Sequence, residues 1–349
     1  MSKNNSPLLG IAVLSACLST FYAAAGEQSG QLLNQTMSKN TTHIQSISDP
    51  AQICGSDDNG QNWQQLQLNA KHQWKKRFNQ TFNKTFNQAK ASKTLDNTAT
   101  EDGEGIAGRY YVPVVFHVYG QRYNCTEGDK CLTDEKIINA LNQTNQDFQG
   151  SNSQDGPIAP QFAAIRASLD VEFVLANKTA NGQVTSGIVR HDREQGGYGD
   201  SETFNGQVAT DSWDNYQYLN VYIMHDLYDN GTLNNSGVAW YPQASMSDQG
   251  LARVVYNGDY LGDNTNENFR SVLTHEFGHW LNLPHTFEQK ACSLSNESFC
   301  SLTGDNSCDT PQMSLASVMK DNAVNCLGQP TNTENFMHYT DNYAMFTQD

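Results

Sequence analysis

Three histidines and a glutamate in the stretch 275–285 have the types and spacing of a catalytic metal site. His275 and His279 are four positions apart, so on an α-helix they project from one face and can reach the same ion. His285 lies six positions after His279, beyond the reach of a straight helix, so the chain must turn sharply between them. Asn282 tolerates the left-handed backbone that this turn needs, and Pro284 stops the helix from continuing.

Three protein ligands with an open fourth position are typical of a catalytic zinc site rather than a structural one. Water takes the open position, and zinc lowers the pKa of that water toward neutrality. Glu276 can accept the proton and pass it to a leaving amine, so the predicted reaction is peptide hydrolysis. Two alternatives stay open: a zinc hydrolase that acts on a non-peptide bond, and a secreted zinc-binding module. Glu276 argues against the second, because a site that only binds needs no base.

The same stretch resembles the zinc-binding consensus of the metzincin metalloproteases, with Asn282 in the usual glycine position, and within that clan it is most similar to the pappalysin family. Residues 335–341 (NFMHYTD) resemble the Met-turn of this family. The resemblance, which covers about residues 112–348, places Met337 beneath the metal and Tyr339 near zinc and substrate. It implies an α+β domain of metzincin type, with a twisted mixed sheet, an active-site helix and a smaller C-terminal subdomain.

The first 25 residues have the pattern of a signal peptide. Lys3 precedes a largely apolar run over residues 8–25, which is short and interrupted by serines, unlike a membrane span. Cleavage after Ala25 would release a secreted, extracellular protein. Residues 14–17 (LSAC) also resemble a bacterial lipobox, which would place a lipid on Cys17, and both outcomes stay open.

Charge and cysteine content agree with an exported protein. A formal net charge of -16 argues against nucleic acid or an anionic membrane surface as a partner. The family resemblance implies proteins or peptides as substrates. Of the eight cysteines, seven remain if Cys17 leaves or is lipidated, so they cannot all pair internally. Cys125 and Cys131 can close a local disulfide. We expect the last four to pair among themselves, in an order left open: Cys292, Cys300, Cys308 and Cys326.

Residues 26–108 are rich in polar residues and poor in aliphatic ones, and are predicted to form a propeptide that inhibits the catalytic domain at 109–349. Cys54 is the odd cysteine, and its thiolate can occupy the open zinc position. Cys54-Gly55 followed by acidic residues is similar to the cysteine switch of metzincin propeptides, although a disulfide or an idle thiol remains an alternative.

Two other parts of this segment carry a prediction. Aromatic residues at every fourth position over 74–86, flanked by lysine and arginine, indicate a basic amphipathic helix that docks on the acidic domain or packs by itself. The small, acidic stretch 94–108 is predicted to be the linker that is cleaved on activation.

In the catalytic domain we expect strands at 110–119, 169–175 and 218–224 and an amphipathic helix over 132–148. His117 is expected to be an ordinary strand residue. Residues 233–241 correspond by resemblance to the edge strand above the cleft, on which an extended peptide can pair.

Two further sites rest on the family resemblance. Asp305, Asp309 and Thr310 are candidate calcium ligands, although a plain polar turn has a similar sequence. Asp341 and Asn342 stand where an acidic pair is typical, and we attribute to that pair a preference for a basic residue after the scissile bond. Because Asn342 has lost the charge, we expect broader specificity. Family members usually continue past the position of Asp349 into a helix, so we expect a fragment or a missing helix.

Overall fold

The computed structural model describes the backbone of residues 54–56 and residues 109–153, 156–200, 202–262, 271–287, 292, 304–313, 323–339 and 342–348. The chain divides into two compact units, Met1–Gln52 and Ile53–Asp349, and all described residues belong to the second unit. Several predictions lie outside the described residues, namely those on the signal peptide, Cys17, the aromatic stripe at 74–86, the linker at 94–108, Cys300 and Asp341.

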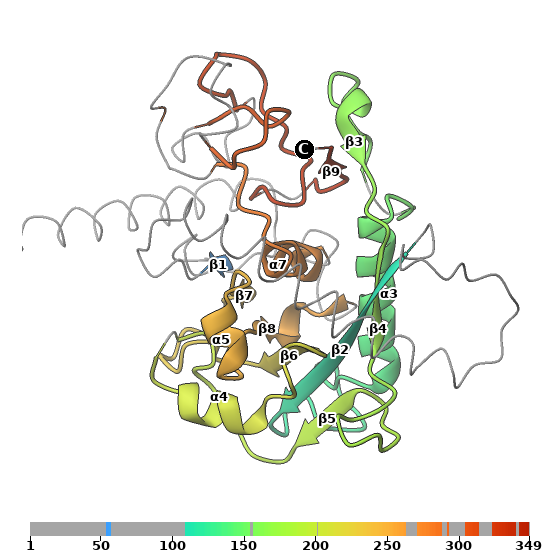
Figure 1. The fold of residues 1–349 in the computed structure, drawn as a ribbon, viewed down its shortest axis with the longest axis vertical. Coiled ribbons are helices and arrows are strands. Elements are labelled where there is room, and N and C mark those ends of the chain that lie inside the picture. The colour runs from blue at the N-terminus through green and yellow to red at the C-terminus, as the bar shows by residue number, and fades with distance from the viewer. Residues whose placement is uncertain are drawn as a thin grey trace, which may run out of the picture. The chain divides into compact units, whose positions relative to one another are not determined.

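A mixed sheet is the frame of the second unit (Figure 1). Its strands lie in the spatial order β1 (Cys54–Ser56), β7 (Gly237–Ala239), β8 (Val254–Asn257), β6 (Leu219–Met224), β2 (Tyr110–Tyr119) and β4 (Val171–Leu175). β4 pairs with the N-terminal half of β2, and β5 (Ile188–His191) pairs with the C-terminal half of β2. The strand pairs of this sheet are parallel, except that β7 is antiparallel to β8.

The central strands are buried along most of their length. β6 and β8 are buried at every residue, and β2 is buried from Val114 to Tyr119. Continuous apolar runs of this kind are expected where both faces of a largely parallel sheet are covered. The predicted bounds of β2 are confirmed, and β4 and β6 begin two residues and one residue later than predicted.

The helix α3 (Asp134–Phe148) covers the sheet beside β4 (Figure 1). It begins after Thr133, whose side chain caps the helix by accepting a hydrogen bond from Lys136 N at 3.3 Å. The Asn145 side chain bonds both the N and the O of Phe173, at 2.7 and 2.8 Å, which joins the helix to β4. The predicted helix is therefore confirmed, with its start moved to the cap.

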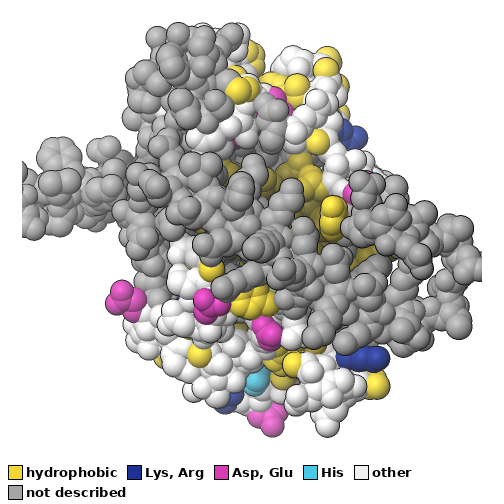
Figure 2. Space-filling view, viewed as in Figure 1, with side chains coloured by type: hydrophobic (Ala, Val, Ile, Leu, Met, Phe, Trp, Pro, Cys, Tyr) yellow, Lys and Arg dark blue, Asp and Glu magenta, His cyan; other side chains and the backbone are white. Residues whose placement is uncertain are grey.

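The remaining elements are short. They are η2 (Ala163–Ile165), α4 (Asn205–Asp211), α5 (Ala244–Asp248), η3 (Gly258–Tyr260), α7 (Val272–Trp280) and a small antiparallel pair of β3 (Arg166–Ala167) with β9 (Phe346–Thr347). None of the described helices is long and apolar enough to span a membrane. On the face drawn in Figure 2, the described Lys and Arg side chains stand apart and form no continuous patch.

Two disulfides join described cysteines. Cys125 pairs with Cys131, which confirms the predicted local bridge. Cys292 pairs with Cys326, in agreement with pairing among the last four cysteines, and Cys308 is disulfide-bonded as well.

Candidate active site

The helix α7 ends in the turn that the sequence predicted. Leu283 N donates to Gly278 O at 2.9 Å and Asn282 N donates to His279 O at 2.8 Å, the two hydrogen bonds of a Schellman motif. Asn282 has a φ of 78°, so the expected left-handed backbone is present. This turn reverses the chain and brings His285 back beside the helix.

The three histidines converge on one point. The Nε2 atom of His279 lies 3.0 Å from that of His275 and 3.1 Å from that of His285. All three side chains are buried. In the described part of the chain, no other group of three or more His, Cys, Asp or Glu side chains is placed to share a metal ion.

Backbone carbonyls orient two of these imidazoles. The Nδ1 atom of His275 lies 2.5 Å from Phe336 O, and that of His279 lies 2.7 Å from Leu283 O. Because a carbonyl only accepts, each Nδ1 carries the proton and each Nε2 keeps its lone pair for a metal. Burial, with the nearby His285 second, holds the pKa of both residues well below the usual value, so both are neutral. This donor set fits zinc.

Glu276 lies in a narrow space between α7 and β7. The residue is fully buried, and an ideal Cβ at Gly237 would lie only 2.5 Å from its Oε1 atom. Gly237 is therefore the residue of β7 that leaves room for this carboxylate. Tyr256 pairs with Gly237 across β7 and β8, and its pKa is raised by burial and, second, by the charge of Glu276.

The two Met-turn residues lie next to the histidines. An ideal Cβ at Gly278 would lie 2.4 Å from the sulfur of Met337, so this methionine packs directly on the helix between two of the candidate ligands. The ring of Tyr339 is 4.9 Å from that of His285 and 5.8 Å from that of His275, measured between centroids. Both side chains therefore border the candidate metal site.

Several supporting residues were missed by sequence reasoning. Thr274 Oγ1 donates to Asp147 Oδ2 at 2.5 Å, which joins α7 to α3, and Asn152 Nδ2 donates to the other carboxylate oxygen at 2.5 Å. The Phe287 ring stacks on His285, with centroids 4.7 Å apart. Tyr241 packs edge-on to His279, at 5.5 Å. No motif marks the contacts of Thr274 with Asp147 and of Tyr241 with His279, because these residues are distant in sequence and meet only in the fold.

The predicted edge strand is present as β7, and β1 occupies its outer side. The two strands are parallel, with Cys54 opposite Gly237 and Ser56 opposite Ala239. The prediction of an open edge therefore does not hold in this state of the chain. The backbone of Cys54 lies across from the glycine that faces Glu276.

The residues proposed for calcium and specificity are only partly brought together. Asp305 accepts hydrogen bonds from Thr310 Oγ1 at 2.5 Å and Ser307 N at 3.0 Å, and burial raises its pKa to about 8. Asp309 instead accepts from Gln348 N at 2.8 Å. Asn342 is exposed.

The C-terminal part of the chain, which holds this site, matches a known family. The model of the pregnancy-associated plasma protein-A peptidase family matches residues 202–349. This part of the chain is therefore similar to the pappalysin family. An extracellular metalloprotease of Colletotrichum graminicola is 25% identical to this protein over 252 residues, 69% of this chain and 73% of the relative. One of Sordaria macrospora is 34% identical over 107 residues, 29% of this chain and 33% of the relative. The match thus spans about a third of the length of the latter.

Solved structures share the fold of this protein. Mature mirolysin of Tannerella forsythia, in complex with a cleaved peptide, superposes with a TM-score of 0.52 and 24% identity, over 69% of this chain and 88% of that one. A promirolysin mutant from the same organism gives a TM-score of 0.53 and 22% identity, over 84% and 90% of the two chains. The predicted α+β fold of metzincin type, with its mixed sheet, is confirmed.

Proposed function

We propose that this protein is a secreted zinc endopeptidase that is synthesised as a latent precursor. The observation that carries the proposal is the convergence of three buried imidazoles with a buried carboxylate beside them. His275, His279 and His285 would hold the metal through their Nε2 atoms. The names of the relatives, extracellular metalloproteases, support both the class of enzyme and its export.

When bound, zinc supplies a Lewis acid that polarises the scissile carbonyl and makes a water molecule acidic near neutral pH. Glu276 accepts the proton of the attacking water and returns it to the leaving amine. Its burial keeps this proton transfer away from bulk solvent, and Gly237, which has no side chain, leaves space for the carboxylate beside β7. The hydroxyl of Tyr339, beside His285, donates a hydrogen bond to the substrate carbonyl oxygen as that atom gains charge. Met337 supports the helix from below.

The substrate binds as an extended strand on β7. The pairing of β1 with β7 supports this proposal, because the backbone groups on the outer side of β7 already bind a short added strand. Main-chain hydrogen bonds would hold the peptide, so unfolded or loop segments are the substrates. Mature mirolysin is known in complex with a cleaved peptide, which supports a peptide substrate here.

The precursor is kept latent by its own N-terminal segment. Cys54 lies opposite Gly237, so the switch cysteine is at the level of Glu276 along the cleft. While β1 is paired with β7, a substrate strand has no edge on which to bind. The existence of a promirolysin supports a precursor form in this family.

Calcium binding by Asp305, Asp309 and Thr310 remains a prediction. Both Asp305 carboxylate oxygens already accept internal hydrogen bonds, and a bound cation would have to replace at least one of them. A rise in the melting temperature on adding calcium, absent in Asp305→Asn, would support the site.

The proposed function is tested with the full chain, trimmed by limited proteolysis and incubated with a denatured protein. We expect peptide-bond cleavage that is abolished by a chelator, restored by zinc, and absent in a Glu276→Ala variant trimmed in the same way. Sequencing the products locates the cleaved bonds. An intact denatured protein, with hydrolysis of a small ester or amide instead, would favour a zinc hydrolase of another substrate class.

A further inference from the structure

The segment that leads into β7 contains a buried carboxamide without a hydrogen-bond partner. Asn235 is 1% exposed, and neither its Nδ2 nor its Oδ1 atom is bonded to any part of the chain that the structure describes. Buried amides in folded proteins are nearly always hydrogen-bonded, because an unpaired one destabilises the fold. An unpaired carboxamide next to a cleft therefore indicates a partner that is absent from this state.

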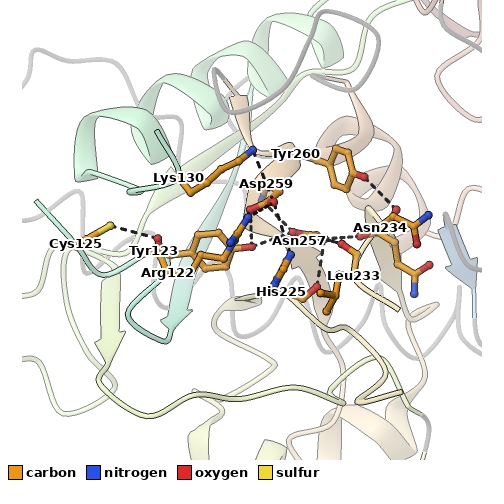
Figure 3. Close-up of polar contacts among 11 residues, drawn as sticks. Arg122, Tyr123, Cys125, Lys130, His225, Leu233, Asn234, Asn257, Asp259 and Tyr260 are labelled. Carbon is orange, nitrogen blue, oxygen red and sulfur yellow. Dashed lines mark hydrogen bonds and ion pairs between the residues drawn. The ribbon is translucent and has the colours of Figure 1, made fainter. Parts of the chain in front are cut away.

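The backbone around this carboxamide is firmly held (Figure 3). Asn257 Nδ2 donates to Leu233 O at 3.0 Å and to Asn235 O at 2.9 Å. The hydroxyl of Tyr260 donates to Asn234 O at 3.2 Å. Three consecutive carbonyls are thus bonded to β8 and η3. The position of Asn235 is set by its backbone, so the unpaired side chain does not result from a loose segment.

We place the side chain of Asn235 on the face of the sheet that is turned toward the carboxylate of Glu276. Asn235 lies two positions before Gly237, the first residue of β7, and Asn257 N donates to Ser236 O at 2.9 Å, so hydrogen bonding to β8 continues into this segment. We extend the alternation of side chains along a strand to this segment, which puts Asn235 on the same face as Gly237. Gly237 faces Glu276. Asn235 therefore lies two residues before the glycine that faces the predicted base.

A peptide that pairs with β7 also places alternate side chains on this face. β1 gives the register, with Cys54 opposite Gly237, so a residue two positions away in the added strand comes opposite Asn235. Neighbouring strands lie about 4.7–4.9 Å apart, so same-face partners across such a pair are within reach of a hydrogen bond between their side chains. The same spacing holds for a strand that runs in either direction.

We propose that Asn235 is a specificity-determining residue that binds the substrate side chain two positions from the one facing Glu276. The inference rests on the proposed function, and concerns a different subsite from that of Asn342. Because a donor and an acceptor are both unpaired, the best complement is a second carboxamide, so the enzyme prefers Gln or Asn at this subsite. An apolar residue there leaves the amide unpaired, which is how a polar pocket rejects an analogue.

The test compares the trimmed full chain with Asn235→Leu and Asn235→Asp on a peptide library. We expect Asn235→Leu to lose at least tenfold in kcat/KM for peptides with Gln or Asn at one subsite and to gain for Leu. Asn235→Asp should select Lys or Arg at that same subsite. Asn234→Leu, the neighbour on the opposite face, should keep the original profile. Unchanged profiles in both Asn235 variants would overturn the proposal.

A stability measurement separates substrate binding from a structural role. Leucine has the same branched outline as asparagine and needs no hydrogen-bond partner, so the precursor of Asn235→Leu should melt at the same temperature or higher. A lower melting temperature with an unchanged profile would assign Asn235 to folding alone. Affinity of Gln and Leu peptides for trimmed Glu276→Gln, measured by fluorescence anisotropy, gives a second readout. If the enzyme cleaves no peptide, yet the affinity still depends on Asn235, only the proposed function is refuted. If neither peptide binds, both the proposed function and the role of Asn235 are refuted.

Discussion

Gly278 and Met337 are packed so closely that no side chain fits between them. An ideal Cβ on Gly278 would lie 2.4 Å from the methionine sulfur and 3.2 Å from its methyl group. Gly278→Ala should therefore push the Met-turn away from the helix and destabilise the protein by about 1–3 kcal/mol, with weaker zinc binding. Thermal unfolding and metal titration would measure both effects.

Two further variants test that interpretation. The double variant Gly278→Ala/Met337→Ala removes the clash, so its loss of stability should be less than the sum of the single losses. Gly206→Ala, in α4, has open space around the new methyl group and should be neutral or stabilising. Equal effects of Ala at positions 278 and 206 would contradict the packing argument.

Variants of the candidate ligands and variants of the candidate base should differ in the amount of zinc that they bind. His275→Ala, His279→Ala and His285→Ala should each lower zinc affinity, because each removes one of three converging nitrogen atoms. Glu276→Ala should keep near-stoichiometric zinc while turnover falls by orders of magnitude. His225→Ala, outside the cluster, should retain both properties. Metal analysis after dialysis gives the answer, and loss of zinc from the Glu276 variant would contradict its assignment as base.

Latency should depend on the thiol of Cys54. If this thiol occupies the open metal position, Cys54→Ala should give an untrimmed precursor that cleaves substrate or itself. Ser56→Ala, in the same short strand, keeps the thiol and should stay latent. Activity is measured on freshly purified full-length chain. A silent Cys54→Ala precursor would mean that strand pairing on β7, or the basic segment at 74–86, blocks the cleft without the thiol.

Specificity after the scissile bond should respond to Asn342. A carboxylate binds guanidinium by charge-assisted hydrogen bonds, whereas an amide is a neutral acceptor, so Asn342→Asp should raise the preference for Arg over apolar residues severalfold. Peptide-library profiling of both forms measures it. Asn181→Asp, an exposed amide in the loop between β4 and β5, controls for the added charge. A strict Arg requirement that Asn342→Asp leaves unchanged would refute the idea.

His117 should make stability depend on pH. Burial lowers the pKa of this residue to about 4, with its hydrogen bond to Asn220 offsetting part of the effect. Between that value and the unfolded pKa of about 6.5, the unfolded chain binds more protons, so stability is present above this window and is lost as pH falls through it. Relative to pH 7, the loss at pH 5 is about 2 kcal/mol.

Urea unfolding of the wild type and of His117→Gln at the two pH values would measure this contribution. Because glutamine does not titrate, the variant should lose about 2 kcal/mol less than the wild type between pH 7 and pH 5. An identical pH dependence in the two proteins would show that His117 is not kept neutral by the fold.

The metal motif could be predicted from sequence because its geometry is local. The helical spacing of His275 and His279 and the left-handed turn at Asn282 depend on backbone rules that act over a few residues. β2 and α3 were predictable for the same reason, since burial imposes a local pattern of apolar residues on the sequence. The first residue of α3 was predicted less accurately than the helix itself. The helix begins after Thr133 because the side chain of this one residue caps it.

Contacts between distant segments were decided only by the tertiary structure. Phe336 O orients His275, Gly237 makes room for Glu276, and Asp147 holds Thr274, yet none of these pairs is marked by a spacing or a motif. The strand order of the sheet brings them together. The same holds for Asn235, an unremarkable residue of a polar loop in sequence, whose unpaired carboxamide has meaning only because folding removes it from water and places it beside β7.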